Sequence, residues 1–185
     1  ETYEQVQSVL RCCHALDVPV VARGAGTGLS GGAMPHALGV TLSLAKFNRI
    51  LSVDPVSCTA VVQSGVRNLA ISEAAAPHGL YYAPDPSSQI ACTIGGNVAE
   101  NAGGVHCLKY GLTVHNVVQV KGFTIDGDAV TFGSEALDAP GYDLLALAIG
   151  SEGMLAVTTE VTVKPGPKPR LARNLMASLD HSRKA

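Results

Sequence analysis

The sequence lacks the basic charge that would support binding to a nucleic acid or to an anionic membrane. Its 185 residues include 13 lysines and arginines against 15 aspartates and glutamates, so the formal net charge is -2. Binding to a phosphate backbone draws on an excess of basic side chains, and attachment to acidic lipids draws on a basic cluster. The charge balance therefore argues against both function classes.

The sequence also lacks any long apolar run. Glycine, proline or a charged residue interrupts every apolar stretch well before the roughly 18 residues that a membrane-spanning helix needs. A signal peptide is not expected, because the chain opens on the acidic and polar residues 1–5. Hydrophobic residues still make up 46% of the chain, which predicts a globular protein with one core or two small lobes.

Cysteine spacing typical of a metal site is absent as well. The five cysteines (Cys12, Cys13, Cys58, Cys92 and Cys107) are odd in number and contain no Cys-x-x-Cys pair. Free thiols in a reducing compartment explain this pattern best. We therefore expect a cytoplasmic location and no metal site.

Glycine, in contrast, is concentrated in one segment. Residues 23–32 read Arg-Gly-Ala-Gly-Thr-Gly-Leu-Ser-Gly-Gly and directly follow an apolar run at 18–22, which predicts a short strand. A backbone of this composition can turn tightly and leave its N–H groups free to face an anion. We interpret the segment as a phosphate-binding loop.

Two familiar phosphate-binding motifs do not fit this loop. Residues 26–31 match Gly-x-Gly-x-x-Gly, but a Rossmann loop opens a helix, and the glycines at 31 and 32 followed by Pro35 prevent a regular one. No Gly-Lys-Ser/Thr follows, so the Walker motif is excluded too. A tight loop without a ligand is disfavoured, because each glycine costs folding entropy that such a loop does not need.

Two further segments extend the pattern. In residues 92–104, Gly95 and Gly96 stand at a predicted helix start, where N–H groups favour anions, and Thr93 and Asn97 add hydrogen-bonding groups. Two such segments fit a diphosphate held from both sides, mainly by main-chain N–H groups. The third segment, residues 150–160, by itself predicts only a helix-to-strand turn. Glu152 in this turn is equally consistent with a solvated surface charge and with a helix cap.

The periodicity predicts an α+β fold. The expected helices span residues 2–15, 67–76, 94–101 and 142–149. The expected strands span residues 18–22, 39–44, 49–54, 59–63, 114–126, 129–132 and 155–163, with hairpins around 54–55 and 126–128.

Taken together, residues 19–32, 84–88, 93–104 and 150–159 resemble the FAD-binding domain of the vanillyl-alcohol oxidase/PCMH flavoprotein superfamily. The resemblance is greatest to the branch that contains the glycolate oxidase FAD subunit and D-lactate dehydrogenases. It implies a PCMH-type fold with a small parallel βαβ lobe and a larger, mainly antiparallel sheet flanked by helices.

The resemblance also implies limits for the domain. Residues 1–165 would form the FAD-binding domain without its N-terminal strand, with sub-lobes of about 1–64 and 65–165. Residues 166–185 would form a linker toward a substrate domain that this chain does not contain.

The implied cofactor is non-covalent FAD, because Thr27 stands where members with covalently attached FAD carry a histidine. The first loop would bind the diphosphate, the residues from 84 to 104 the diphosphate, ribityl and flavin groups, and those from 152 to 157 the ribose and adenine. The implied FAD-binding residues are Arg23, Gly24, Ala25, Gly26, Thr27, Gly28, Leu29, Ser30, Pro84, Asp85, Ser88, Thr93, Gly95, Gly96, Asn97, Asn101, Ala102, Gly103, Gly104, Glu152, Gly153 and Val157.

For the parent protein, the resemblance implies oxidation of a D-2-hydroxy acid, glycolate or D-lactate, by hydride transfer from C2 to flavin N5. The proton acceptor would belong to the absent domain, so this chain alone is expected to bind FAD without turnover. Related flavin-fold and iron–sulfur subunits are implied as partners, with a location peripheral to the inner membrane through them. Two alternatives stay open: a non-catalytic FAD-fold module of a flavoprotein complex, and another superfamily member such as an enolpyruvyl-sugar reductase.

No catalytic residue is assigned within the chain. Of its six histidines, the candidate proton acceptors, only His106, just after Gly103 and Gly104, is expected near the flavin. An ordinary loop position is the preferred interpretation even for this residue. The other histidines are His14, His36, His78, His115 and His181.

Overall fold

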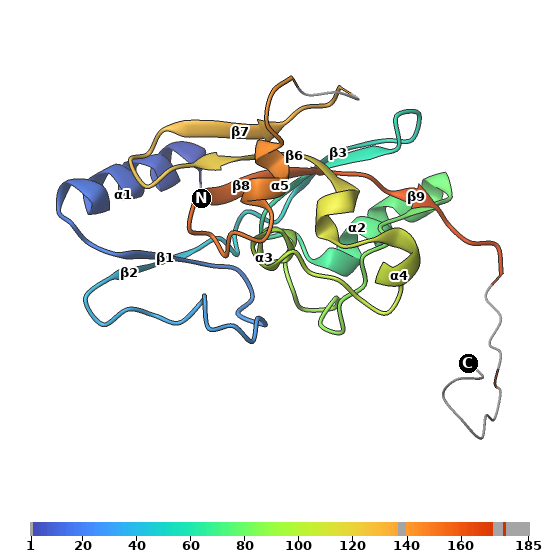
Figure 1. The fold of residues 1–185 in the computed structure, drawn as a ribbon, viewed down its shortest axis with the longest axis horizontal. Coiled ribbons are helices and arrows are strands. Elements are labelled where there is room, and N and C mark those ends of the chain that lie inside the picture. Colours follow the sequence, from blue (N-terminus) through green and yellow to red (C-terminus); the bar gives the residue numbers. More distant parts are fainter. Residues whose placement is uncertain (1, 137–139, 172–175, 177–185) are drawn as a thin grey trace.

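A five-stranded antiparallel sheet forms the centre of the fold (Figure 1). The structure is a computed structural model, and it describes residues 2–136, 140–171 and 176. The strands pair in the order β3-β4-β8-β6-β7. Their bounds are β3 Ile50–Asp54, β4 Thr59–Gln63, β6 Val117–Phe123, β7 Ala129–Gly133 and β8 Val157–Val163.

Tight turns join two of the neighbouring strand pairs. Between β3 and β4, the Asp54 carboxylate accepts hydrogen bonds from the Val56 amide and the Ser57 hydroxyl, each at 2.8 Å. Between β6 and β7, Gly127 adopts a φ of 78°, which glycine reaches without steric cost. Both predicted hairpins are confirmed, because their turn chemistry is local.

Two helices, α2 (Asn68–Ala75) and α3 (Ile94–Glu100), pack against this sheet and bury the main core. Ile71 of α2 is 1% exposed, and Ile94 and Val98 of α3 are 0% and 2% exposed. Removing side chains of this size from water stabilises a fold by about 1.5–3 kcal/mol each. This packing fixes the position of α3 against the sheet.

A second, smaller core lies beneath α1 (Tyr3–Ala15). Val6 and Leu10, one helical turn apart, bury their side chains in a cluster shared with β1 (Val20–Arg23) and β2 (Val40–Ser43). The strands β1 and β2 form a separate parallel pair. In Figure 1 this unit lies at the left of the view, whereas α2 lies on the right and α3 between them.

The predicted α+β class, with a small parallel sheet and a larger antiparallel sheet, is therefore confirmed. Residues 24–39 join the parallel strands β1 and β2 through turns and bends, without a helix. The glycines and Pro35 explain this, as the sequence predicted.

Two strand pairings run across the expected limits of the sub-lobes and of the domain, and those limits stay a prediction. The strands β3 and β4 pair with β8 of the C-terminal half, so one sheet crosses the sub-lobe limit expected near residue 64. In addition, β9 (Gly166–Pro167), the start of the expected linker, pairs with β5 (Leu80–Tyr81). The rest of that segment lies largely outside the described residues.

The remaining elements are short. They are the 3-10 helices η1 Ala76–His78 and η2 Thr113–Asn116, and the helices α4 Cys107–Tyr110 and α5 Leu144–Ala148. The strand expected from residue 114 begins only at Val117, because the Asn116 amide donates to the Tyr110 and Leu112 carbonyls, each at 2.9 Å. Among the described residues, no helix is long and apolar enough to cross a membrane.

Candidate functional site

A cavity of about 550 Å³ lies where three segments of the chain meet. Its walls come from the first glycine-rich loop, from the region around α3, and from residues 152–154. This volume is within the range of small-molecule and cofactor sites. The cavity is thus the leading candidate for the functional site.

The first glycine-rich loop offers free hydrogen-bond donors to this cavity. Within the described chain, no group accepts a hydrogen bond from the main-chain N–H groups of residues 25–30. Gly26 has a φ of 73°, a conformation that side chains rarely adopt, and a Cβ there would stand 3.0 Å from the Arg23 guanidinium. The loop therefore presents consecutive N–H groups beside one positive side chain, a combination that suits an anion.

Close contacts fix α3 against the loop and the sheet. A Cβ at Gly24 would collide with the Thr93 hydroxyl, and a Cβ at Gly95 would stand 2.8 Å from the Ser64 Cβ. Ser64 lines the cavity, is 2% exposed, and its hydroxyl has no hydrogen-bond partner within the described residues. A buried hydroxyl of this kind is costly unless something else satisfies it, which a ligand in the cavity can do.

The third segment is held in place by the end of α3. The Gly150 amide donates to the Val98 carbonyl, and the Glu152 amide donates to the Ala99 carbonyl, each at 2.8 Å. These bonds bring residues 152–154 to the cavity, although about fifty residues separate them from α3 along the chain. The structure thus gathers the three segments that the sequence grouped into one site.

Most of the predicted site residues line this cavity, and their role as cofactor contacts stays a prediction. Those that line it are Arg23, Gly24, Ala25, Gly26, Thr27, Gly28, Leu29, Ser30, Ser88, Thr93, Gly95, Gly96, Asn97, Ala102, Gly103, Glu152 and Gly153. Those that lie outside its lining are Pro84, Asp85, Asn101, Gly104 and Val157.

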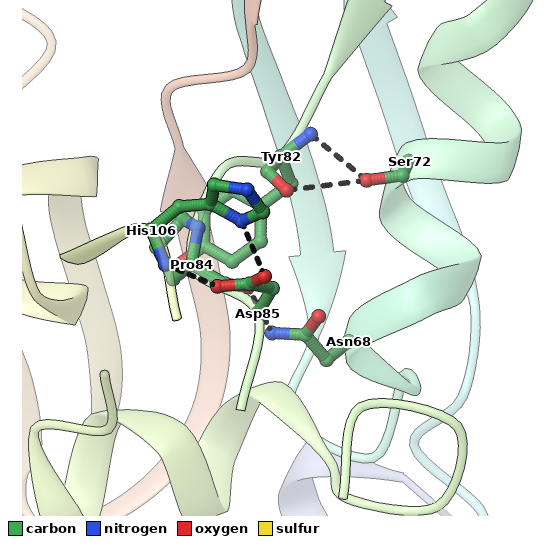
Figure 2. A network of polar contacts seen from close by, with 6 residues as sticks. All are labelled: Asn68, Ser72, Tyr82, Pro84, Asp85 and His106. Carbon is green, nitrogen blue, oxygen red and sulfur yellow. Dashed lines mark hydrogen bonds and ion pairs between the residues drawn. The ribbon is translucent and has the colours of Figure 1, made fainter. Parts of the chain in front are cut away.

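Two of the residues outside the lining hold the segments that surround it. The Asp85 carboxylate contacts the His106 ring with an Nδ1–Oδ2 distance of 2.6 Å and accepts the His106 amide N–H at 3.2 Å (Figure 2). A Cβ at Gly104 would collide with Asp85. The residues after Pro84 and those after Gly103 are therefore tightly joined.

The Pro84 carbonyl belongs to a second, buried network. Asn68 of α2 is 1% exposed and donates from Nδ2 to the Pro84 carbonyl at 3.1 Å (Figure 2). The same Nδ2 group also donates to Asn97 Oδ1 at 3.0 Å. Asn97 in turn donates to the Cys92 sulfur at 3.4 Å. Ser72 lies one helical turn further along α2, and its hydroxyl donates to the Tyr82 carbonyl and accepts the Tyr82 amide N–H. The segment that leads to the cavity is thus anchored to α2.

Asn101 and Val157 also have structural roles. Asn101 ends α3 with a φ of 49°, and its side-chain oxygen accepts the Val114 amide N–H at 3.0 Å. Val157 is 8% exposed in the core beneath α1.

Aromatic side chains cluster beyond His106. The centroid of its ring lies 6.5 Å from that of the Tyr110 ring. The Tyr110 ring stands edge-on to the Tyr81 ring, with the two centroids 5.9 Å apart. A hydrogen bond with the Tyr81 hydroxyl lowers the pKa of Tyr110, with a smaller contribution from Lys109. Burial, and secondarily Tyr110, raises the pKa of Tyr81.

The histidines of the described chain do not line the cavity. His14 pairs with Asp126 at 3.0 Å, and the Nδ1 atoms of His36 and His115 accept nearby main-chain N–H groups. His78 ends η1, and His181 lies outside the described residues. His106 stands three positions after Gly103, which does line the cavity. The described residues also contain no cluster of ligands that could hold a metal ion.

Sequence reasoning missed Ser64 and Glu100 as residues of the cavity lining. Glu100 stands four positions after Gly96 in the same helix, so the two share a helix face, and this spacing could have identified it. Ser64 follows the end of β4 and carries no comparable signal, because its place depends on contact with Gly95.

Comparison with known proteins agrees with this geometry. A family model described as an FAD binding domain matches residues 1–133. The chain is 69% identical over 182 residues to the glycolate oxidase subunit GlcD of Escherichia coli K12, a match that covers 98% of this chain and 36% of that protein. It is 43% identical over 175 residues to GlcD of Bacillus subtilis, with 94% and 37% covered.

Two further likenesses extend the comparison. A D-lactate dehydrogenase of Anaerostipes hadrus is 41% identical over 174 residues, covering 94% of this chain and 36% of that protein. A solved structure of an alkyldihydroxyacetonephosphate synthase matches with a TM-score of 0.80 and 24% identity, covering 92% of this chain and 31% of that one, a likeness of fold alone. The chain thus spans little more than a third of the length of the curated relatives it matches.

Proposed function

This chain belongs to the family of FAD binding domains, and from that premise we propose that it holds FAD in a longer enzyme that oxidises a D-2-hydroxy acid. The proposed substrates are glycolate and D-lactate, which figure in the names of relatives at 69% and 41% identity. The parent protein supplies the remaining walls of the active site and the group that accepts the substrate proton.

The observation that carries the proposal is the cavity lined by consecutive free N–H groups at residues 25–30. The donor set fits FAD: unpaired amides suit the diphosphate, and the Ser64 hydroxyl offers a partner to a polar group of the cofactor. When bound, FAD supplies the two-electron acceptor for the oxidation. Thr27 stands where members with covalently attached FAD carry a histidine, so we propose that the cofactor is held without a covalent bond.

The chain's own residues then bind and orient the cofactor. The N–H groups of residues 25–30, together with Arg23, offset its negative charge, and the close contacts of Gly24 and Gly95 hold the two walls at a fixed separation. The Asp85–His106 pair and the hydrogen bonds of Asn68 hold the segment that begins at Pro84 in a fixed position beside α3. Contacts of this kind hold the cavity walls in place, and a site held in place by its own chain lowers the entropy cost of binding.

The test uses the full-length parent protein. It is expected to purify with a flavin absorption spectrum, and the flavin band is expected to bleach when glycolate or D-lactate is added without oxygen. L-lactate is the matched control and should bleach it far more slowly. Flavin that no hydroxy acid bleaches would refute the proposed activity and favour a non-catalytic FAD module or a reductase of another class.

The proposal includes partners and location. We propose that the parent protein works with related flavin-fold and iron–sulfur subunits, and that it is cytoplasmic and meets the inner membrane only through them. Co-purification of a tagged parent protein, with iron and labile sulfide measured in the eluate, tests this. An eluate that contains flavin but no iron, from cells that express the flavin-fold and iron–sulfur subunits, would contradict the proposed partners.

The isolated chain is expected to bind FAD at most. Reduction of a dye with glycolate or D-lactate by this chain alone would show that the substrate-binding groups lie within it.

A further inference from the structure

One hydrogen bond joins the first glycine-rich loop directly to α3. The Ser30 hydroxyl donates to Oε2 of Glu100 at 2.9 Å, across 70 residues of sequence. Both residues line the cavity. The bond therefore crosses from one wall of the site to the other.

The loop leaves room for this carboxylate. A Cβ at Gly28 would stand 3.6 Å from Glu100 Oε1, and a Cβ at Gly32 would stand 4.0 Å from it. Two glycines thus flank the Glu100 carboxylate on the loop side. A Cβ at either position would therefore be in ordinary van der Waals contact with the carboxylate.

The carboxylate is an unexpected group in this place. The charged side chains lining the cavity, among the described residues, are Arg23, Glu100 and Glu152, so the lining carries more negative than positive charge. A diphosphate cofactor bound there is attracted by the free N–H groups and by Arg23, and it is repelled by both carboxylates. Of these two, Glu100 is the one with a direct hydrogen bond to the anion-binding loop.

We propose that Glu100 sets the affinity for FAD through two opposed effects. Its hydrogen bond with Ser30 positions the loop against α3 and so favours binding. Its negative charge opposes the anionic cofactor and so disfavours binding. The inference rests on the proposed function only in that FAD is the anion concerned.

Two single substitutions separate the effects. Glu100→Gln removes the charge and keeps an oxygen that accepts the Ser30 hydroxyl, whereas Ser30→Ala removes the hydrogen bond and keeps the charge. Glu73→Gln is the matched control, because Glu73 is an exposed residue of α2 that does not line the cavity. Thermal unfolding of each apoprotein shows whether the fold is retained.

The measurement is the Kd for FAD of the full-length apoprotein, followed by flavin fluorescence at two salt concentrations. A unit charge several ångströms from a phosphate, in surroundings between water and a protein interior, changes Kd by about 3- to 10-fold. Glu100→Gln should lower Kd by about this factor at low salt and by less at high salt. Ser30→Ala should raise Kd about 2- to 10-fold at both salt concentrations.

The outcomes separate the inference from the proposed function. Unchanged or weaker FAD binding by Glu100→Gln, with normal binding by the wild type, overturns the electrostatic effect. Unchanged or tighter binding by Ser30→Ala overturns the positioning effect. A folded wild-type apoprotein that does not bind FAD at all overturns the cofactor assignment itself, and the inference with it.

Discussion

His106 and Asp85 are joined twice, through the ring at 2.6 Å and through the His106 amide N–H at 3.2 Å. One carboxylate therefore fixes both the backbone and the side chain of the residue that follows Gly104 by two positions. The Asp85 side chain is 19% exposed and the His106 side chain 64% exposed. The carboxylate is thus largely shielded from water, whereas the ring that it holds stays accessible.

We expect Asp85→Ala to lower the free energy of unfolding by about 1.5–3 kcal/mol, because a hydrogen bond to a charged group contributes about that much. It should also weaken FAD binding, since the residues after Pro84 lose their link to those after Gly103. Chemical denaturation and a fluorescence titration with FAD measure the two effects in the full-length protein.

The control for this prediction is Asp126→Ala. Asp126 pairs with His14 at 3.0 Å, and both side chains are more than half exposed and outside the cavity lining. The loss of such a surface pair should cost no more than about 0.5 kcal/mol and leave FAD affinity unchanged. Equal effects of the two substitutions on FAD affinity would show that the Asp85–His106 pair has no positioning role.

Adjacent glycines of α3 allow packing to be separated from the cavity. A Cβ at Gly95 would stand 2.8 Å from the Ser64 Cβ, so Gly95→Ala should destabilise the fold by about 1–3 kcal/mol. A Cβ at Gly96 would meet only the Thr93 hydroxyl, at an ordinary 3.6 Å. Gly96→Ala should therefore keep or slightly raise stability, by up to about 1 kcal/mol, and weaken FAD binding because the methyl group enters the cavity lining.

Thermal unfolding of both apoproteins and titration with FAD test this pair of expectations. Gly96→Ala with wild-type FAD affinity would mean that no part of the cofactor approaches this wall. Gly95→Ala with wild-type stability would mean that Ser64 gives way without cost.

The sequence predicted the features that depend on near neighbours in the chain. The hairpins at 54–55 and 126–128 follow from turn residues, and α1 follows from the spacing of Val6 and Leu10. The glycine-rich loop and its lack of a helix followed in the same way from glycine and proline. Local chemistry determines each of these features.

Contacts between distant segments could not be predicted in this way. Ser30 and Glu100 are 70 residues apart, and the approach of Gly95 to Ser64 depends on how α3 packs on the sheet. The resemblance grouped the three segments into one site but gave no partner for any side chain. The place of Asp85 at the cofactor stays a prediction, and its pairing with His106 outside the cavity lining is a contact that the resemblance did not supply.

The Tyr81–Tyr110 pair gives a spectroscopic prediction. The hydrogen bond with the Tyr81 hydroxyl is the largest cause that lowers the pKa of Tyr110. Tyr81→Phe should therefore raise the pKa of Tyr110 toward its ordinary value, which an ultraviolet difference titration can follow. Tyr142, 93% exposed, provides the reference transition. A Tyr110 transition that does not move in Tyr81→Phe would contradict the assignment of this cause.

Asn68 provides the sharpest test of the buried network. Its Nδ2 group bonds the Pro84 carbonyl and Asn97 Oδ1, and the side chain is 1% exposed. Asn68→Ala leaves two buried oxygens without this donor, so we expect a loss of about 2–3 kcal/mol in the free energy of unfolding. Asn48→Ala, at an exposed position, should change it by no more than about 0.5 kcal/mol.

Asn68→Asp distinguishes the hydrogen bonds from simple loss of volume. The new carboxylate has nearly the same shape as the amide but would aim an oxygen at two acceptors in a buried site, so it should destabilise at pH 7 at least as much as alanine. Its destabilisation should shrink as the pH falls, because a protonated carboxyl regains one donor. An Asn68→Asp protein as stable as the wild type at pH 7 would show that the Asn68 amide does not hold Pro84 and Asn97 together.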